Sequence, residues 1–282
     1  MNDLIINFTP TGMIPTKEQT PHVPVTSAEI IRDVKEAWEL GITTAHLHVR
    51  DPLTHEPGYK KEAYSELISG IREFAPELVI CVSTSGRSFS DFARRSEVLQ
   101  LKGDLKPDMG SLTLSSLNFN KQASINEPAM IMDLAKLMLD NGIKPELEVF
   151  DSGMINYGKY LIRKGLLKPP YYFTFILGNI ACAQVDLLHI GMMIKDLPEG
   201  ALFSLGGVGK NQLTANSLAV SMGYGVRVGL EDNIWYDLSR TRLATNYELL
   251  QRIHDMACAN QRQIMPSSCF RRLLELNSNC NS

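Results

Sequence analysis

The chain has 282 residues, of which 44% are hydrophobic and 21% are charged. This composition is typical of a globular protein with a large core, and it excludes an intrinsically disordered chain. Lysine and arginine together number 28 and aspartate and glutamate 31, so the formal net charge of −3 argues against nucleic acid as a partner.

Short runs of β-branched and apolar residues alternate along the chain with longer segments of helical periodicity. The predicted strands are residues 4–8, 44–49, 79–83, 110–114, 146–150, 172–177, 201–205 and 226–230. The predicted helices are residues 27–40, 59–74, 91–101, 128–141, 154–164, 184–194, 211–222 and 245–258. Thr26 or Ser27 is suited to begin the first helix, because Glu29 then lies in its first turn.

Eight strand–helix units at near-regular spacing fill the chain, and no linker or low-complexity tract separates domains. The pattern predicts an α/β fold, a (β/α)8 TIM barrel. We expect a single domain over residues 1–282 whose last ~30 residues form an extra helical tail. A doubly wound open sheet is the alternative, because periodicity does not show whether a sheet closes. Active sites of such barrels lie at the C-terminal ends of the strands, so polar residues there are the candidates.

Two histidines lie on the second predicted strand. His46 and His48 are two residues apart, so their side chains point to the same face. A pair of neutral imidazoles suits zinc, and the alternative is one core histidine beside one rim histidine. A catalytic zinc takes three protein ligands. The other histidines fall in loops or predicted helices, so we expect the third ligand to be Glu231 or Asp232, two adjacent acids after the eighth strand.

Further polar residues lie near strand ends. Arg50 and Asp51 follow the histidine pair, and we interpret them as a structural ion pair. Glu146 and Glu148 share one face of the fifth strand. Acids inside a barrel need partners, so an inward and an outward orientation both stay open. Residues 206–210, GGVGK, precede a helix, and such loops bind phosphate in this fold, although a tight turn alone also needs glycine.

Four strings together resemble the β-keto acid cleavage enzyme family: HLHVRD, VSTSGR, PELEVFDSGM and RVGLEDNIWY. The resemblance runs from the N-terminal NFTPTG to about residue 250. It implies a zinc-containing (β/α)8 barrel that condenses a β-keto acid with acetyl-CoA, giving acetoacetate and a new acyl-CoA. It also implies a homo-oligomer, for which a tetramer is one candidate form.

The resemblance implies a role for each matching residue. Zinc would be bound by His46, His48 and Glu231. Asp232 would be the base that takes a proton from the carbon between ketone and carboxylate, and Arg227 would orient it or stabilise developing charge. Glu148 matches an acid of the inner site. The positions that hold the substrate carboxylate correspond to Ser83, Gly86 and Ser111.

The sequence departs from the family at one binding position. Members that cleave an amino-bearing keto acid carry a glutamate there, which pairs with the substrate amine, and this chain has Ile14. An apolar side chain does not pair with an ammonium group, so we expect a substrate with a neutral or apolar tail.

Acetyl-CoA carries several phosphates, so a mildly acidic chain must provide positive potential locally where they bind. We expect this cofactor-binding site at Gly206, Gly207 and Lys210.

Two other functions compete with this prediction. A metal-dependent barrel hydrolase that activates water usually carries further histidines on later strands, and the predicted fifth to eighth strand ends have none. A non-catalytic metal- or CoA-binding protein leaves unexplained why acids, an arginine and hydroxyls gather at the same strand ends.

The expected partners are small molecules, without a membrane or nucleic acid. No apolar run approaches the roughly 20 residues that a membrane helix needs, and the first residues lack the pattern of a signal peptide. Five cysteines without a CxxC pair indicate neither a disulfide framework nor a zinc finger. We therefore expect a cytoplasmic protein.

Overall fold

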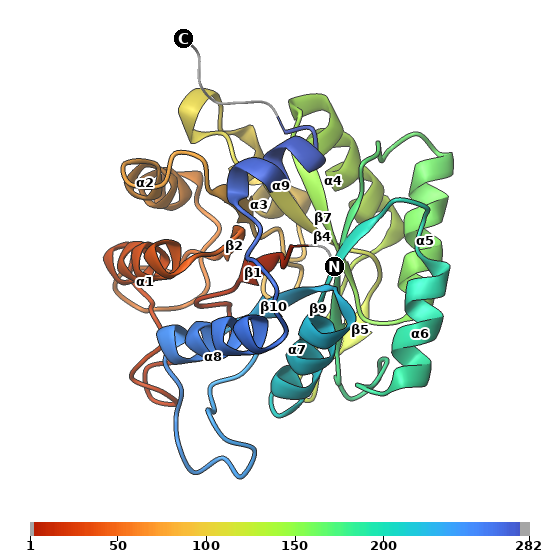
Figure 1. The fold of residues 1–282 in the computed structure, drawn as a ribbon. Coiled ribbons are helices and arrows are strands. Elements are labelled where there is room, and N and C mark those ends of the chain that lie inside the picture. Colours follow the sequence, from red (N-terminus) through yellow and green to blue (C-terminus); the bar gives the residue numbers. More distant parts are fainter. Residues whose placement is uncertain (1–2, 277–282) are drawn as a thin grey trace.

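Parallel strands close into a barrel in the computed structural model, which describes residues 3–276 (Figure 1). Within these residues the eight barrel strands are β1 (Ile6–Phe8), β2 (Thr44–Leu47), β3 (Val79–Val82), β4 (Met109–Thr113), β7 (Lys144–Val149), β8 (Tyr172–Leu177), β9 (Leu202–Gly207) and β10 (Gly225–Val228). Asn7 of β1 pairs with Arg227 of β10, which closes the sheet. The predicted single-domain (β/α)8 barrel is confirmed, and the open sheet is excluded.

Successive side chains of each strand point to opposite faces of the sheet, so one short strand contributes side chains both to the outer core and to the barrel interior. In β2, Ala45 and Leu47 belong to the apolar core between barrel and helices, while His46 faces the interior. Both sets are buried, because helices cover the outside of a parallel barrel and side chains fill its inside.

The helices surround the barrel in Figure 1. They are α1 (Ser27–Leu40), α2 (Lys61–Arg72), α3 (Phe92–Ser96), α4 (Pro128–Asn141), α5 (Ser152–Arg163), α6 (Leu187–Asp196), α7 (Asn211–Met222), α8 (Asn246–Ala259) and α9 (Ser267–Leu273). Thr26, one of the two residues predicted to begin this helix, caps α1 and forms a capping box with Glu29.

One local prediction was wrong, and one small element was not predicted. The helix expected over residues 91–101 ends at Ser96 and continues as a 3₁₀ helix, Glu97–Gln100. Val98 and Leu99 are buried there, so the apolar pattern does not distinguish the two helix types. A hairpin of β5 (Leu117–Asn118) and β6 (Ala123–Ser124) also follows β4. Strands of two residues are too short to show an alternating pattern.

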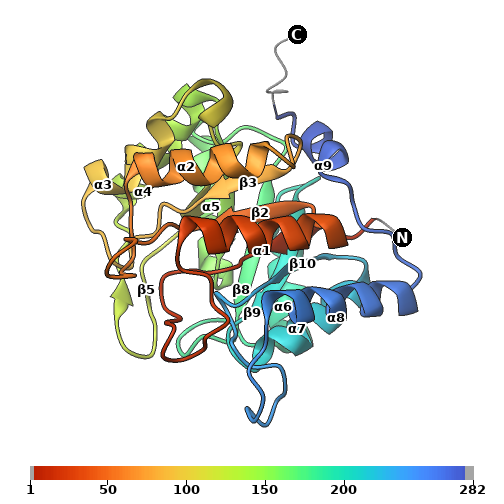
Figure 2. The same ribbon diagram turned by 90° about the vertical axis from the view of Figure 1, so that its left-hand side faces the viewer.

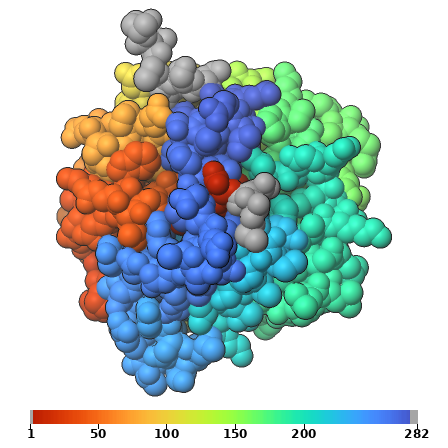
Figure 3. Space-filling view, in the orientation of Figure 1, coloured from red at the N-terminus to blue at the C-terminus, as the bar shows by residue number. Residues whose placement is uncertain are grey.

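The segment after α8 closes the N-terminal end of the barrel. Phe270 of α9 packs edge-to-face on Tyr172 with ring centroids 5.1 Å apart, and both belong to a buried cluster with Ile5. Arg271 donates to Asp108 Oδ2 at 2.6 Å. Figures 1 and 3 show α9 across the middle of this face, and Figure 2 shows β5 at the opposite end.

Within the predicted tail, Ser267–Leu273 form α9, and residues 277–282 lie outside the described residues. Across residues 3–276, every helix is too short or too polar to cross a lipid bilayer.

Candidate active site

His46 and His48 converge at the C-terminal end of β2. Their Nε2 atoms are 3.2 Å apart, and His48 Nε2 lies 3.4 Å from Glu231 Oε1. Ligand atoms of the three residues all lie within 4.8 Å of one another. The two imidazoles therefore share one face, as their spacing predicts, and the carboxylate beside them comes from Glu231.

The donor set fits a divalent cation. Glu231 Oε2 is buried and has no hydrogen-bond partner among the described residues. Glu146 Oε2 lies 2.6 Å from His46 Nδ1, the carboxylate–histidine arrangement that orients a metal ligand. Two imidazoles and one carboxylate that leave a position open are typical of catalytic zinc sites.

A second cluster, His46 with Cys81 and Glu146, fits a cation less well. Cys81 Sγ–H donates to Glu146 Oε2 at 3.0 Å. Burial raises the pKa of this thiol well above its ordinary value, so it stays protonated. A thiol must lose its proton to bind a metal.

The two imidazoles differ in protonation. Burial lowers the pKa of His48, which keeps this ring neutral and able to act as a ligand. Burial also opposes a charge on His46, but the Glu146 and Glu231 carboxylates raise its pKa to about 9. A cation that binds His46 Nε2 therefore displaces a proton.

Arg227 of β10 is buried inside the barrel and faces four carboxylates. The closest distances are 2.7 Å to Glu231, 2.8 Å to Asp232, 3.4 Å to Glu148 and 3.9 Å to Glu146. Burial opposes the charge of the guanidinium, but these acids raise its pKa well above the ordinary value. Glu146 and Glu148 thus point inward, which settles the orientation that the strand pattern left open.

The four carboxylates differ in pKa although they share this arginine. Burial opposes ionisation in all of them, but Arg227 and the adjacent histidines lower the pKa of Glu146 and Glu231. In Glu148 and Asp232 the effect of burial prevails and raises the pKa. Carboxylates with pKa values pushed apart are characteristic of acid–base sites.

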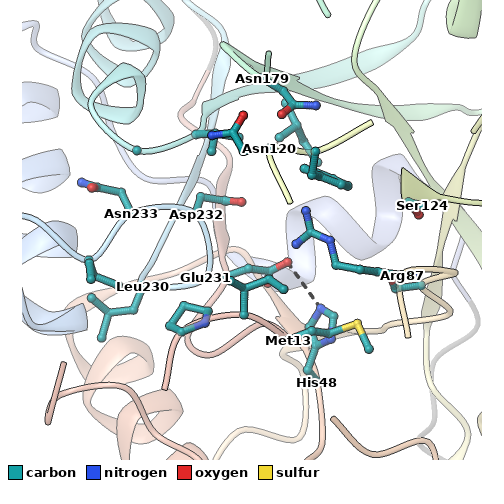
Figure 4. Close-up of a pocket in the computed structure, with 18 of the residues that line it drawn as sticks. Met13, His48, Arg87, Asn120, Ser124, Asn179, Leu230, Glu231, Asp232 and Asn233 are labelled. Carbon is teal, nitrogen blue, oxygen red and sulfur yellow. Dashed lines mark hydrogen bonds and ion pairs between the residues drawn. The ribbon is translucent and has the colours of Figure 1, made fainter. Parts of the chain in front are cut away.

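These groups line a pocket of about 440 Å³ at the C-terminal end of the barrel (Figure 4). Of the residues predicted from the sequence, the lining contains Ile14, His46, His48, Ser83, Glu148, Arg227, Glu231 and Asp232. They come from the N-terminal loop and from the ends of β2, β3, β7 and β10. The structure therefore brings these predicted residues together from distant parts of the chain.

Two residues predicted to hold the substrate carboxylate lie behind this lining in the described structure. Ser111 Oγ accepts a hydrogen bond of 3.1 Å from the Thr84 N–H. A Cβ on Gly86 would lie 2.6 Å from the Ile125 carbonyl oxygen. Both residues support the loop after β3, and that loop places Ser83 in the pocket.

The predicted CoA residues also lie outside the lining formed by residues 3–276. A Cβ on Gly206 would lie 2.9 Å from Arg227 Cβ, and one on Gly207 would lie 2.5 Å from the Asn211 carbonyl oxygen. Because these two glycines have no side chain, Arg227 and the first turn of α7 pack directly against them. Lys210 is exposed just before α7.

Arg50 and Asp51 do not form the predicted ion pair with each other in the described structure. Arg50 instead donates to the carbonyl oxygens of Gly12, at 2.9 Å, and Pro15, at 2.8 Å. The Asp51 carboxylate accepts from backbone N–H groups of its own loop. The prediction was wrong because backbone carbonyl groups of the N-terminal loop, rather than the Asp51 carboxylate, accept hydrogen bonds from the Arg50 guanidinium. Arg50 thereby fixes the loop that carries Ile14.

Several lining residues were not predicted, among them Arg87, Phe119, Asn120 and Asn179. Figure 4 shows Arg87 extending into the pocket, with Asn120 and Asn179 on the far side. Arg87 is the last residue of the VSTSGR string, and this string is the sequence signal that could have identified Arg87 as a pocket residue. The others lie in loops whose position depends on tertiary packing.

The family model for beta-keto acid cleavage enzyme matches residues 3–276. The chain belongs to the β-keto acid cleavage enzyme family. The resemblance carried by the four sequence strings is thereby confirmed. As a member of this family the protein is an acyltransferase that cleaves a carbon–carbon bond of β-keto acids.

Named relatives of this family match over almost the whole chain. The chain is 34% identical to the 3-keto-5-aminohexanoate cleavage enzyme of Fusobacterium nucleatum, over 98% of this chain and 99% of that protein. It is 31% identical to the 3-oxoadipate:acetyl-CoA acetyltransferase of Cupriavidus necator, over 97% and 95% respectively. The apo structure of ObcA superposes with a TM-score of 0.79 at 20% identity, over 91% of this chain and 66% of that chain, which shows the shared fold.

Proposed function

We propose that the protein is a zinc-dependent enzyme that condenses a β-keto acid with acetyl-CoA and yields acetoacetate and a new acyl-CoA. The observation that carries this proposal is the convergence of His46, His48 and Glu231 beside Asp232 in one pocket. These three residues would hold zinc, which supplies a Lewis acid for the substrate ketone.

Asp232 is the proposed base. Its carboxylate lines the pocket and is held by Arg227 Nε at 2.8 Å and by the Thr9 hydroxyl at 3.5 Å. It would remove a proton from the carbon between ketone and carboxylate, with Arg227 stabilising the charge that develops. Glu148, bonded to the Thr113 hydroxyl at 2.7 Å, completes the inner site.

The remaining steps follow from the carbanion that Asp232 generates. This carbon attacks the acetyl thioester carbon, and the CoA thiolate leaves. The thiolate then attacks the former ketone carbon, and the carbon–carbon bond next to it breaks. Asp232 returns its proton to the released fragment, which is acetoacetate, while the tail leaves as acyl-CoA.

The pocket supports a substrate with a neutral or apolar tail. Ile14 lines the pocket and is 46% exposed, so it is available to a ligand. Met13 and Pro15 flank it in the same lining. Because this wall offers no carboxylate, an amino-bearing tail would lose its hydration without gaining a partner.

The phosphates of acetyl-CoA are proposed to lie at the loop of Gly206, Gly207 and Lys210. Residues 208 and 209 of this loop line the pocket, and a Cβ on Gly209 would lie 3.3 Å from Arg240 Nη2. Lys210 on the loop and Arg240 beside it thus provide two basic side chains. The Gly209 N–H already donates to the Asp232 carbonyl oxygen at 2.7 Å, so side-chain charge rather than this amide would attract phosphate.

A cytoplasmic homo-oligomer is also part of the proposal. Apolar side chains that are 52–72% exposed gather on α6 and the loop before it: Ile180, Leu187, Leu188 and Met192. Burial of such a face between copies would stabilise an oligomer, with a tetramer as one form. Light scattering after size-exclusion chromatography measures the state, and a monomer at micromolar concentration would contradict this part.

A screen of β-keto acids with acetyl-CoA and zinc tests the proposed reaction. We expect acetoacetate and a new acyl-CoA, detected by mass spectrometry, only when acetyl-CoA is present. His46→Ala should abolish turnover and zinc binding while circular dichroism stays unchanged. Product release without acetyl-CoA would instead support a hydrolase that activates water.

A further inference from the structure

Arg87 presents an unused guanidinium to the pocket. It lies on the loop after β3, and Figure 4 shows its side chain reaching the centre of the pocket beside Glu231. Its Nε is buried and has no hydrogen-bond partner, and within residues 3–276 the guanidinium forms no ion pair. Glu231, Asp232 and Glu148 favour its charge without contacting it. A buried N–H without a hydrogen-bond partner is costly, so this group is suited to bind an anion that enters the pocket.

Phe119 holds this guanidinium in place. The central carbon of the Arg87 guanidinium lies 3.3 Å from the centroid of the Phe119 ring. Phe119 itself packs edge-to-face on Phe150, with centroids 5.8 Å apart. Stacking occupies a face of the planar group and leaves its N–H edges free, which suits a carboxylate accepted through two parallel hydrogen bonds.

The charge of the pocket explains why a substrate anion needs this group. Glu146, Glu148, Glu231 and Asp232 share a single arginine within ion-pair distance, Arg227. A β-keto acid that enters brings a further negative charge next to these acids. Other basic lining residues, such as Lys121, are exposed at the rim and already hydrated.

We propose that Arg87 binds the carboxylate that every β-keto acid carries next to its reactive carbon. The proposal rests on the proposed function, because it places the reactive carbon beside Asp232. Ser83, on the same loop, also lines the pocket and would supply a hydroxyl to the same anion. Arg87 is thus a substrate-binding residue, and it selects acids over uncharged ketones of the same shape.

The test uses acetoacetate and acetoacetamide, which have the same carbon skeleton and differ in charge at the carboxyl position. Each is titrated into the zinc-loaded protein without acetyl-CoA and followed by calorimetry. We expect the unmodified protein to bind acetoacetate at least about tenfold more tightly than the amide. Arg87→Gln should remove this preference, and Arg87→Lys should retain part of it, because the charge remains and the planar fork is lost.

Lys121→Gln is the matched control, since it removes one positive charge from the rim of the same pocket. It should leave the preference for acetoacetate unchanged. The proposal is overturned if Arg87→Gln keeps the preference or if Lys121→Gln abolishes it equally. It is also overturned if Arg87→Gln weakens only keto acids with a second carboxylate in the tail. Because binding is measured without acetyl-CoA, failure of the proposed turnover would be seen separately.

Discussion

Gly12 allows the N-terminal loop to pack directly on the predicted metal ligand Glu231. Its φ is +63°, and a Cβ at this position would lie 2.4 Å from Glu231 Cγ. Ordinary contacts begin at 3.4 Å, so Gly12→Ala forces a shift of about 1 Å. Metal–ligand distances in proteins stay within about 0.2 Å of their standard values. Because Arg227 and His48 hold the Glu231 carboxylate in place, we expect the shift to weaken zinc binding ~10–100-fold, as for other disturbed ligand orientations.

Gly165→Ala separates this clash from backbone strain. Gly165 has a φ of +72°, and a Cβ there would have nothing within 4 Å. Both variants should lose about 1–2 kcal/mol of unfolding free energy from the left-handed backbone, measured by urea titration. Only Gly12→Ala should lose zinc affinity, measured by competition with a chromophoric chelator. Equal zinc affinity in the two variants would refute the reasoning.

Further predictions concern orientation, pH and specificity. Glu146→Gln should weaken zinc binding ~10–100-fold in the same chelator assay, because it removes the carboxylate 2.6 Å from His46; unchanged affinity would exclude this role. Burial opposes ionisation of Glu29, but Lys17 and backbone N–H groups lower its pKa from 4.5 to about 2. The folded-state pKa is therefore the lower one, so the stabilisation is complete above the ordinary pKa and is lost as the pH falls towards 2. Glu29→Gln should cost about 1–2 kcal/mol in urea at pH 7, and a penalty that stays constant down to pH 3 would contradict this. Ile14→Glu should raise kcat/KM for an amino-bearing keto acid relative to an uncharged one, and an unchanged ratio would show that residue 14 does not contact the tail.

Strand periodicity accounts for most of what could be predicted. Residues two apart on a strand point the same way, so the sequence alone places His46 and His48 on one face. Chain order then brought Glu231 to the same end of the barrel. The orientation of Glu146 and Glu148 stayed open, because it depends on partners such as Arg227 that belong to other strands.

Loop residues were harder to predict for a physical reason. The place of Arg87 depends on Phe119, which lies in the hairpin after β4, and no local pattern links the two. Arg50 likewise binds carbonyl groups more than thirty residues before it rather than its neighbour Asp51. Such contacts form between segments that only the closed barrel brings together, so the local sequence does not predict them.

The segment that leads into α9 and covers the N-terminal end of the barrel contacts residues from the first part of the chain. The Thr43 hydroxyl donates to the Met265 carbonyl oxygen, 222 residues away, and Leu4 forms a bridge with Ile264. Contacts of such long range form late and slow the folding of a domain. A growing chain therefore lacks the cover of the N-terminal end of the barrel until residues 264–273 have been synthesised. Truncation here would uncover Ile5 and Tyr172, unlike the removal of an ordinary terminal extension.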